Sequence, residues 1–223
     1  MIDFSKIQAV IFDMDGVLIN SEPMWKKVET AVFASVGIDF EAVGGEKTVG
    51  LRIDEVIDYW FGLYPWKNKT KQEVVDEILV QMEHEILNRG EEMTGVTEAL
   101  QFFKSKSLKI GLASSSFERL IHATLTRLGL SSYFDVVLSA EHLDYGKPHP
   151  SIYLEAANQL EVDPLNCLVI EDSLNGVIAG KAAKMNVVAI PDGTHSPNPK
   201  LVLADLQLDS LLELIRFIDE SNC

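Results

Sequence analysis

The chain has few cysteines and no long apolar run. Only Cys167 and Cys223 are cysteines among its 223 residues, so we expect no structural disulfide and a reducing compartment. Its apolar runs are far shorter than the roughly 20 residues that a membrane-spanning helix needs. The first residues also lack the basic stretch, apolar stretch and cleavage site of a secretion signal. We therefore expect a cytoplasmic protein without a membrane partner.

Basic residues are also scarce. The chain has 19 lysines and arginines against 34 acidic residues, which gives a net charge of −15. This balance disfavours nucleic-acid binding through a broad basic surface, so we expect no nucleic-acid partner. It also means that an anionic small molecule needs a locally basic pocket. The 5 histidines are scattered, with no pair at the spacing of zinc ligands, so we expect no zinc site.

Strand-like and helix-like patterns alternate along most of the chain. A short β-branched run at residues 7–12 predicts a buried strand. Beyond Gly95 the pattern predicts further strands at 109–113, 134–138, 167–170 and 187–190, and helices at 96–106, 117–128, 152–160 and 175–184. This alternation predicts an α/β fold with a Rossmann-like parallel sheet covered on both faces.

The segment between the first two strands has no strand-like pattern. Ser21 is a candidate helix cap before Pro23, and Thr70 with Glu73 forms a capping-box pattern. We therefore predict an α/β core made of residues 1–19 and 93–223, with a helical cap inserted at residues 20–92. The two connecting segments, 18–21 and 90–95, are the expected hinges.

Polar residues follow several of the predicted strands. Asp13 and Asp15 follow the first strand, and residues 114–116, all serines, follow the second. Lys147 comes after the strand that ends at Leu138. The pair Glu171–Asp172 comes after the strand that ends at Ile170. Ligands of open α/β sheets bind beyond the carboxyl ends of the strands, so these groups are expected to converge there.

In chain order these segments read Asp-x-Asp-Gly-x-Leu, Ala-Ser-Ser-Ser, Gly-Lys-Pro and Glu-Asp-Ser-x-x-Gly. Together they resemble the four motifs of the haloacid dehalogenase superfamily, over nearly the whole chain. Within it, the sequence is similar to β-phosphoglucomutase-like phosphatases with a helical cap after the first motif. The stretches at 20–25, 49–54 and 64–66 are similar to bacterial hexitol and 2-deoxyglucose-6-phosphate phosphatases.

The resemblance implies that two aspartates perform the chemistry. Asp13 would attack phosphorus and form an aspartyl-phosphate, and Asp15 would protonate the leaving alcohol and then activate water. The implied cofactor is Mg²⁺, which prefers oxygen ligands. Its ligands would be Asp13, the backbone carbonyl of Asp15, and Asp172. Glu171 would bind the metal directly or act on a metal-bound water, and this choice stays open.

The resemblance also implies a phosphate-binding set. Ser114 and the backbone N–H of Ser115 would bind phosphoryl oxygens, and Lys147 would offset the charge that Asp13 and the phosphate share. A turn or helix-cap role is the alternative for Ser114, and a cap role equally suits Ser116. The Lys147–Pro148 bond is expected to be cis by the same resemblance.

Three residues of the inserted segment are candidates for substrate contact. Arg52 is expected to reach the substrate, with a surface position at a helix end as its alternative. Trp25 lies just after the first hinge and is expected in the pocket. Glu22 is a further candidate, although acids in the first turn of a helix also favour its dipole. The other aromatic residues of the segment are equally suited to packing in its core.

These features predict a Mg²⁺-dependent phosphatase, acting as a monomer on small sugar or sugar-alcohol phosphates. The expected substrates include hexose 6-phosphates, 2-deoxyglucose 6-phosphate and hexitol phosphates. A sugar-phosphate mutase remains an alternative, although mutases of the family have histidine where this chain has Trp25. A dehalogenase and a phospho-acceptor signalling domain are further alternatives. The acid/base Asp15 argues against both.

Overall fold

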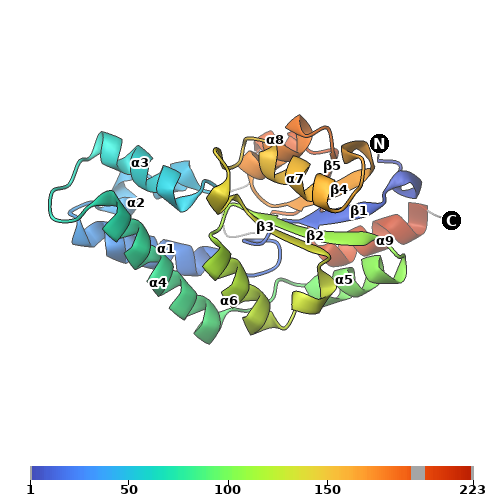
Figure 1. Ribbon diagram of the computed structural model, residues 1–223, viewed down its shortest axis with the longest axis horizontal. Helices are drawn as coiled ribbons and strands as arrows, with labels where there is room; N and C mark the ends of the chain where they lie inside the picture. The colour runs from blue at the N-terminus through green and yellow to red at the C-terminus, as the bar shows by residue number, and fades with distance from the viewer. Residues whose placement is uncertain (1, 192–198, 222–223) are drawn as a thin grey trace.

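The structure is a computed structural model that describes residues 2–191 and 199–221. Within these residues, six parallel strands form one sheet in the order β3-β2-β1-β4-β5-β6 (Figure 1). The strands are β1 (Ala9–Phe12), β2 (Lys109–Ser114), β3 (Val136–Ser139), β4 (Cys167–Glu171), β5 (Asn186–Ala189) and β6 (Leu206–Gln207). The predicted α/β class and Rossmann-like sheet are confirmed. Only the two-residue strand β6 has no counterpart in the prediction.

Helices cover both faces of the sheet. The helices of this part are α5 (Val96–Ser105), α6 (Glu118–Leu128), α7 (Ser151–Gln159), α8 (Leu174–Ala182) and α9 (Leu211–Ser221). Helices α7 and α8 lie over one face, and α5 and α9 lie over the other (Figure 1). Strand β1 is buried between them, so Val10 and Phe12 enter one apolar cluster while Ala9 and Ile11 enter the other. This is the side-chain alternation of a strand buried on both sides.

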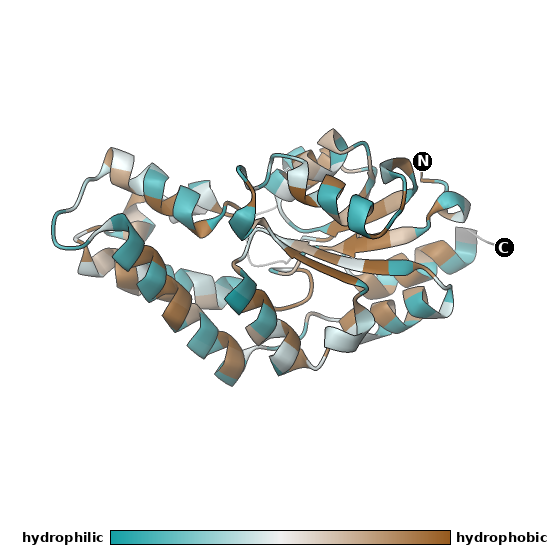
Figure 2. Cartoon of the chain, in the orientation of Figure 1, coloured by the Kyte–Doolittle hydropathy of each residue, from teal (hydrophilic) through white to brown (hydrophobic). Residues whose placement is uncertain are grey.

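The remaining helices project from one end of the sheet, as the predicted cap should (Figure 1). They are α1 (Glu22–Ser35), α2 (Phe40–Val43), α3 (Ile53–Leu63) and α4 (Lys71–Arg89). Apolar residues concentrate on their mutually facing sides and on the strands, while the outer sides are polar (Figure 2). Phe33 stacks on Phe40 with ring centroids 4.5 Å apart, and Trp60 and Trp66 are buried beside them. These aromatic residues form the core of the cap.

The two segments that join the cap to the sheet lie side by side. The amide of Met93 donates to Leu18 O at 3.0 Å, and the amide of Asn20 donates to Glu91 O at 3.0 Å. Ile19 and Glu92 form an antiparallel bridge between these bonds. The chain therefore leaves the sheet and returns to it at adjacent points. The domain boundaries at residues 19/20 and 92/93 stay predictions.

Within the described ranges, no helix combines the length and apolar character needed to cross a membrane.

The capping box at the start of α4 is formed as predicted. The Glu73 amide donates to Thr70 Oγ1 at 3.2 Å, and the Thr70 amide donates to Glu73 Oε2 at 2.6 Å. We expect Thr70→Ala to lower the free energy of unfolding by about 1 kcal/mol, because an N–H of the first turn loses its acceptor. For a chain of this size the melting temperature should fall by roughly 2–4 °C. Thr70→Ser keeps the hydroxyl and should melt close to the wild type; equal losses in both variants would contradict the capping role.

Candidate active site

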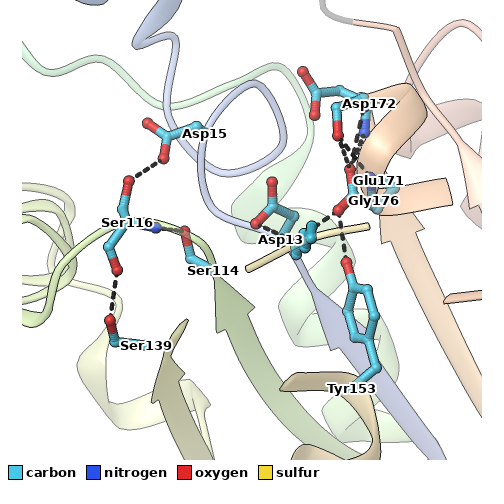
Figure 3. Close-up of polar contacts among 11 residues, drawn as sticks. Asp13, Asp15, Ser114, Ser116, Ser139, Tyr153, Glu171, Asp172 and Gly176 are labelled. Carbon is cyan, nitrogen blue, oxygen red and sulfur yellow. Dashed lines mark hydrogen bonds and ion pairs between the residues drawn. The ribbon is translucent and has the colours of Figure 1, made fainter. Parts of the chain in front are cut away.

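The register of the central strands brings the predicted motifs to one edge. Phe12 of β1 pairs with Leu112 of β2 and with Ile170 of β4. The next residue of β1, Asp13, therefore lies level with Glu171 at the carboxyl end of β4 (Figure 3). Ser114 ends β2 at the same edge. The convergence expected from an open α/β sheet is present.

A buried ammonium group connects these strand ends. Lys147 lies on the segment between β3 and α7 and is only 2% exposed. Its Nζ lies 2.7 Å from Asp13 Oδ1 and 2.7 Å from Glu171 Oε1. Burial lowers the pKa of Lys147, but the two carboxylates outweigh burial and hold this pKa above its ordinary value. The Lys147–Pro148 bond is cis, as predicted.

Protein donors occupy both oxygens of Glu171. Oε1 accepts from Lys147 and, at 2.6 Å, from the Tyr153 hydroxyl (Figure 3). Oε2 accepts from the Asp172 amide and from the amide and hydroxyl of Ser173, each at 3.1 Å. Burial alone would raise the pKa of Glu171, but Lys147 and these donors lower it. Glu171 is therefore an ionised carboxylate, and both of its oxygens accept hydrogen bonds from the protein.

Asp13 is held less firmly in its ionised form. Burial raises its pKa to about 7. The nearby carboxylates of Glu171 and Asp15 add to this rise, while Lys147 opposes it. A further positive charge beside Asp13 would favour the carboxylate over the neutral acid.

An acidic cluster could supply that positive charge by holding a metal ion. Asp13, Glu171 and Asp172 can each offer one oxygen, and these oxygens lie within 4.8 Å of one another. Gly16 leaves the space for Asp172, since a Cβ at Gly16 would lie 2.2 Å from Asp172 Oδ2. Because donors already occupy Glu171, Asp13 and Asp172 are the better ligands. Carboxylate oxygens in this arrangement fit a hard cation such as Mg²⁺.

Asp15 points away from this cluster and is bound on both oxygens. Ser21 Oγ and Trp25 Nε1 donate to its Oδ1 at 2.6 and 3.0 Å. Ser116 Oγ donates to its Oδ2 at 2.7 Å (Figure 3). Ser21 occupies the N-cap position of α1, as expected, but its hydroxyl makes no capping hydrogen bond and donates to Asp15 instead. Ser116 is not a cap, because the N-cap of α6 is Phe117. Both serines instead orient Asp15, a role that their sequence positions alone do not distinguish from capping.

The serines after β2 face the same space. Ser114 Oγ accepts from the Ser116 amide at 3.0 Å. Ser115 Oγ is buried and has no hydrogen-bond partner among the described residues.

These groups line one pocket between the sheet and the cap. Most predicted site residues border it, namely Asp13, Asp15, Glu22, Trp25, Ser114, Ser115, Lys147 and Asp172. Glu171 lies behind this surface and, with Arg52, is absent from the described lining residues. The cap also contributes Glu29, which the sequence analysis did not identify. The sequence feature that points to Glu29 is its spacing: it lies seven residues after Glu22 on the same helix, and so on the same side of that helix.

Arg52 connects the cap to the core. Its guanidinium pairs with Asp54 and donates to the carbonyl oxygens of Ala140 and Leu143 at 2.8 and 2.7 Å. Glu55 Oε1 accepts from the Gly146 amide at 3.2 Å on the same segment. The structure therefore does not bring Arg52 to the pocket. Sequence spacing predicted a cap residue near the core but not which core atoms it would bind.

The sequence profile of haloacid dehalogenase-like hydrolases matches residues 7–184. The chain belongs to this family. Its relatives include hexitol phosphatase B of Escherichia coli, with 43% identity over 94% of this chain and 95% of that one. A phosphorylated carbohydrates phosphatase of Thermotoga maritima is 36% identical over 79% of this chain and 82% of its own length. These matches confirm the resemblance predicted from the motifs and identify the enzyme as a phosphatase.

A solved structure agrees with the family and with the fold. A β-phosphoglucomutase from Clostridium difficile superposes with a TM-score of 0.83 and 30% identity, covering 96% of each chain.

Gly176 tests the importance of the Glu171 position. A Cβ at residue 176 would lie 1.6 Å from Glu171 Oε1, whereas a Cβ at Gly62 meets nothing within 4 Å. Gly176→Ala should displace the Glu171 carboxylate and lower kcat/KM for phosphate release by about 10- to 100-fold. Gly62→Ala is the control and should keep full activity with equal or higher stability. Unchanged activity in Gly176→Ala would show that the Glu171 position is not needed.

Glu29 gives a pH-dependent prediction. Burial, helped by the charge of Glu22, raises its pKa from 4.5 to about 8. The native state therefore keeps a proton that the unfolded chain releases, and stability falls as pH rises between these two values. Glu29→Gln has no carboxyl group to titrate, so its stability should not show this fall. The unfolding free energy of the variant minus that of the wild type should therefore increase from about pH 5 to pH 8. Urea unfolding across this range measures the difference; a pH-independent difference would refute the raised pKa.

Proposed function

We propose that this enzyme is a Mg²⁺-dependent phosphatase of small sugar and sugar-alcohol monophosphates. The observation that carries the proposal is the pairing of two differently held aspartates in one pocket. Asp13 lies beside Lys147 and Asp172, while Asp15 is held by neutral donors on the opposite side. One carboxylate is thus suited to attack and the other to proton transfer. The relation to hexitol phosphatase B supports the substrate class.

Asp13, Asp172 and the backbone carbonyl of Asp15 would hold the metal. When bound, Mg²⁺ would neutralise charge shared by Asp13 and the phosphoryl group, which is most of the assistance that phosphoryl transfer needs. Glu171 would orient Lys147 and the Asp172 backbone rather than bind the metal, since both its oxygens already accept from the protein. This favours the indirect role that the sequence left open.

In the first step, an Asp13 carboxylate oxygen forms a bond to phosphorus as the bond to the sugar oxygen breaks. Asp15 gives its proton to that leaving oxygen, so the product is a neutral alcohol. Ser114, the Ser115 backbone and Lys147 bind the phosphoryl oxygens. Ser114, Ser115 and Lys147 all line the pocket beside Asp13, which supports this placement.

In the second step, Asp15 takes a proton from water as the water oxygen attacks phosphorus. The Asp13–phosphorus bond breaks and the carboxylate is restored, with inorganic phosphate as the second product. The bonds from Ser21, Trp25 and Ser116 hold Asp15 in place for both proton transfers. The cap limits water access during the first step.

Trp25 supports hydrolysis over mutase chemistry. An indole N–H donates a hydrogen bond but does not take up a proton, and here it is already bound to Asp15. Trp25 therefore gives a second sugar hydroxyl no base for accepting the phosphoryl group. The mutase and phospho-acceptor alternatives remain outcomes of the experiment below. The cytoplasmic location and the monomeric state stay predictions.

We expect phosphate release from hexitol and hexose phosphates that requires Mg²⁺ and is lost on addition of a chelator. Asp13→Asn should lower kcat by about 10³-fold or more, because the amide is a poor nucleophile. Asp76→Asn, on the exposed face of α4, is the control and should retain activity.

Three results would overturn the phosphatase. Sugar isomerisation without phosphate release would establish a mutase. An Asp13 phosphate that persists for many minutes would establish a phospho-acceptor. Metal-independent release with Asp13→Asn fully active would exclude this site altogether.

A further inference from the structure

One face of helix α1 borders the pocket. Glu22, Trp25 and Glu29 follow one another at intervals of three and four residues, so they share a side of the helix, and all three line the pocket. Met24 and Val28 lie on another side and are buried in the cap core. The two carboxyl groups therefore belong to the wall that faces the catalytic edge of the sheet.

Most other polar groups on the cap side of the pocket are already bound. Trp25 donates to Asp15, and Thr48 Oγ1 donates to Gly45 O at 3.0 Å and accepts from Trp60 Nε1 at 3.2 Å. The remaining cap wall comes from apolar or small residues, namely Gly45, Val49, Gly50, Leu51, Ile53 and Val56. Glu29 makes no hydrogen bond or ion pair within residues 2–191 and 199–221. Its carboxyl group is therefore available to a substrate.

Among the described residues, none that lines the α1 end of the pocket is a lysine or an arginine. Lys147 is the one cation among the described lining residues, and two ion pairs hold it at the sheet edge. The lysines of α1 are directed elsewhere: Lys26 pairs with Glu41 at 3.1 Å and Lys27 pairs with Glu85 at 2.7 Å. Among the described lining residues, the one cation thus lies at the sheet edge, and the opposite end on α1 carries two carboxyl groups.

We propose that Glu29 binds hydroxyl groups of the substrate's tail and, with Glu22, excludes substrates that carry a second anionic group there. This inference rests on the phosphatase function proposed above and defines its substrate class as monophosphates with a neutral polyol tail. Sugar bisphosphates and phosphorylated sugar acids are disfavoured.

The chemistry of the two carboxyl groups suits this selection. A carboxyl group near apolar surface accepts from one sugar hydroxyl and, while it holds its proton, donates to another. A second phosphate or a carboxylate would lose water at this end, meet the negative charge of Glu22, and find no cation among the described residues that line this end. The raised pKa of Glu29 is consistent with its apolar, acidic surroundings.

Glucitol 6-phosphate and 6-phosphogluconate form a matched pair for the test. They share the carbon chain and the phosphate ester and differ in the far carbon, which is a neutral alcohol in one and a carboxylate in the other. Phenyl phosphate serves as a third substrate without tail hydroxyls. The wild type should favour glucitol 6-phosphate over 6-phosphogluconate by at least about 30-fold in kcat/KM.

Three substitutions separate hydrogen bonding at position 29 from the effect of a charge introduced there. Glu29→Leu should lower kcat/KM for glucitol 6-phosphate by about 10- to 100-fold, as expected for one or two lost hydrogen bonds. The fold-loss in kcat/KM of this variant on phenyl phosphate should be at least about tenfold smaller than its fold-loss on glucitol 6-phosphate. Glu29→Gln keeps a donor and an acceptor and should stay within about fivefold of wild type on glucitol 6-phosphate. Glu29→Lys should reduce the preference against 6-phosphogluconate by at least about tenfold.

Each result bears on the proposal. Equal losses of Glu29→Leu on all three substrates, or a Glu29→Gln variant as impaired as Glu29→Leu, would overturn the hydroxyl-binding role. A wild type that hydrolyses both sugar phosphates equally, or a Glu29→Lys variant with unchanged preference, would overturn the exclusion of anions.

If the wild type hydrolyses none of the three compounds, the phosphatase proposal itself fails. Calorimetric binding of the two sugar phosphates to the wild type then decides this inference separately. Tighter binding of glucitol 6-phosphate supports the proposed selection, and equal or reversed affinities overturn it.

Discussion

The buried ammonium of Lys147 is the interaction on which the catalytic edge depends. Asp13 and Glu171 are brought together by neighbouring strands, and without a cation between them their charges would repel in a medium that solvates them poorly. Lys147 satisfies both at 2.7 Å. Tyr153 and the backbone after β4 then fix Glu171 from the other side. The strand ends, the segment before α7 and the start of α8 are thereby joined through one charged group.

Asp15, a carboxylate in the same pocket, is held by neutral hydrogen-bond donors instead of an ammonium group. Its partners are neutral, and they come from both parts of the molecule: Trp25 belongs to α1 of the cap, while Ser116 follows β2 of the sheet. Neutral donors orient a carboxylate without stabilising its charge as strongly as an ammonium does. The full set of partners of Asp15 exists only when the cap lies against the sheet.

The sheet and the catalytic edge could be predicted because they follow from periodicity and from ordered motifs at strand ends. Strand β6 could not, since two residues carry no periodic signal. Arg52 was assigned to the pocket from its place in the cap, but its donors bind the carbonyl oxygens of Ala140 and Leu143, a tertiary pairing that spacing does not encode. Glu29 was not predicted as a pocket residue. Its helical spacing from Glu22 was visible, but only the packing of α1 against the sheet decides that this side of the helix borders the pocket.

The paired connecting segments have a consequence for how such an enzyme diversifies. Because Leu18 and Asn20 bond directly to Met93 and Glu91, the inserted helices begin and end at a single point of attachment. An insertion with adjacent ends places no demand on the length or shape of what lies between them. The distal helices of the insertion can therefore be remodelled while the strand ends keep their positions, provided that the first turns of α1 still supply donors to Asp15.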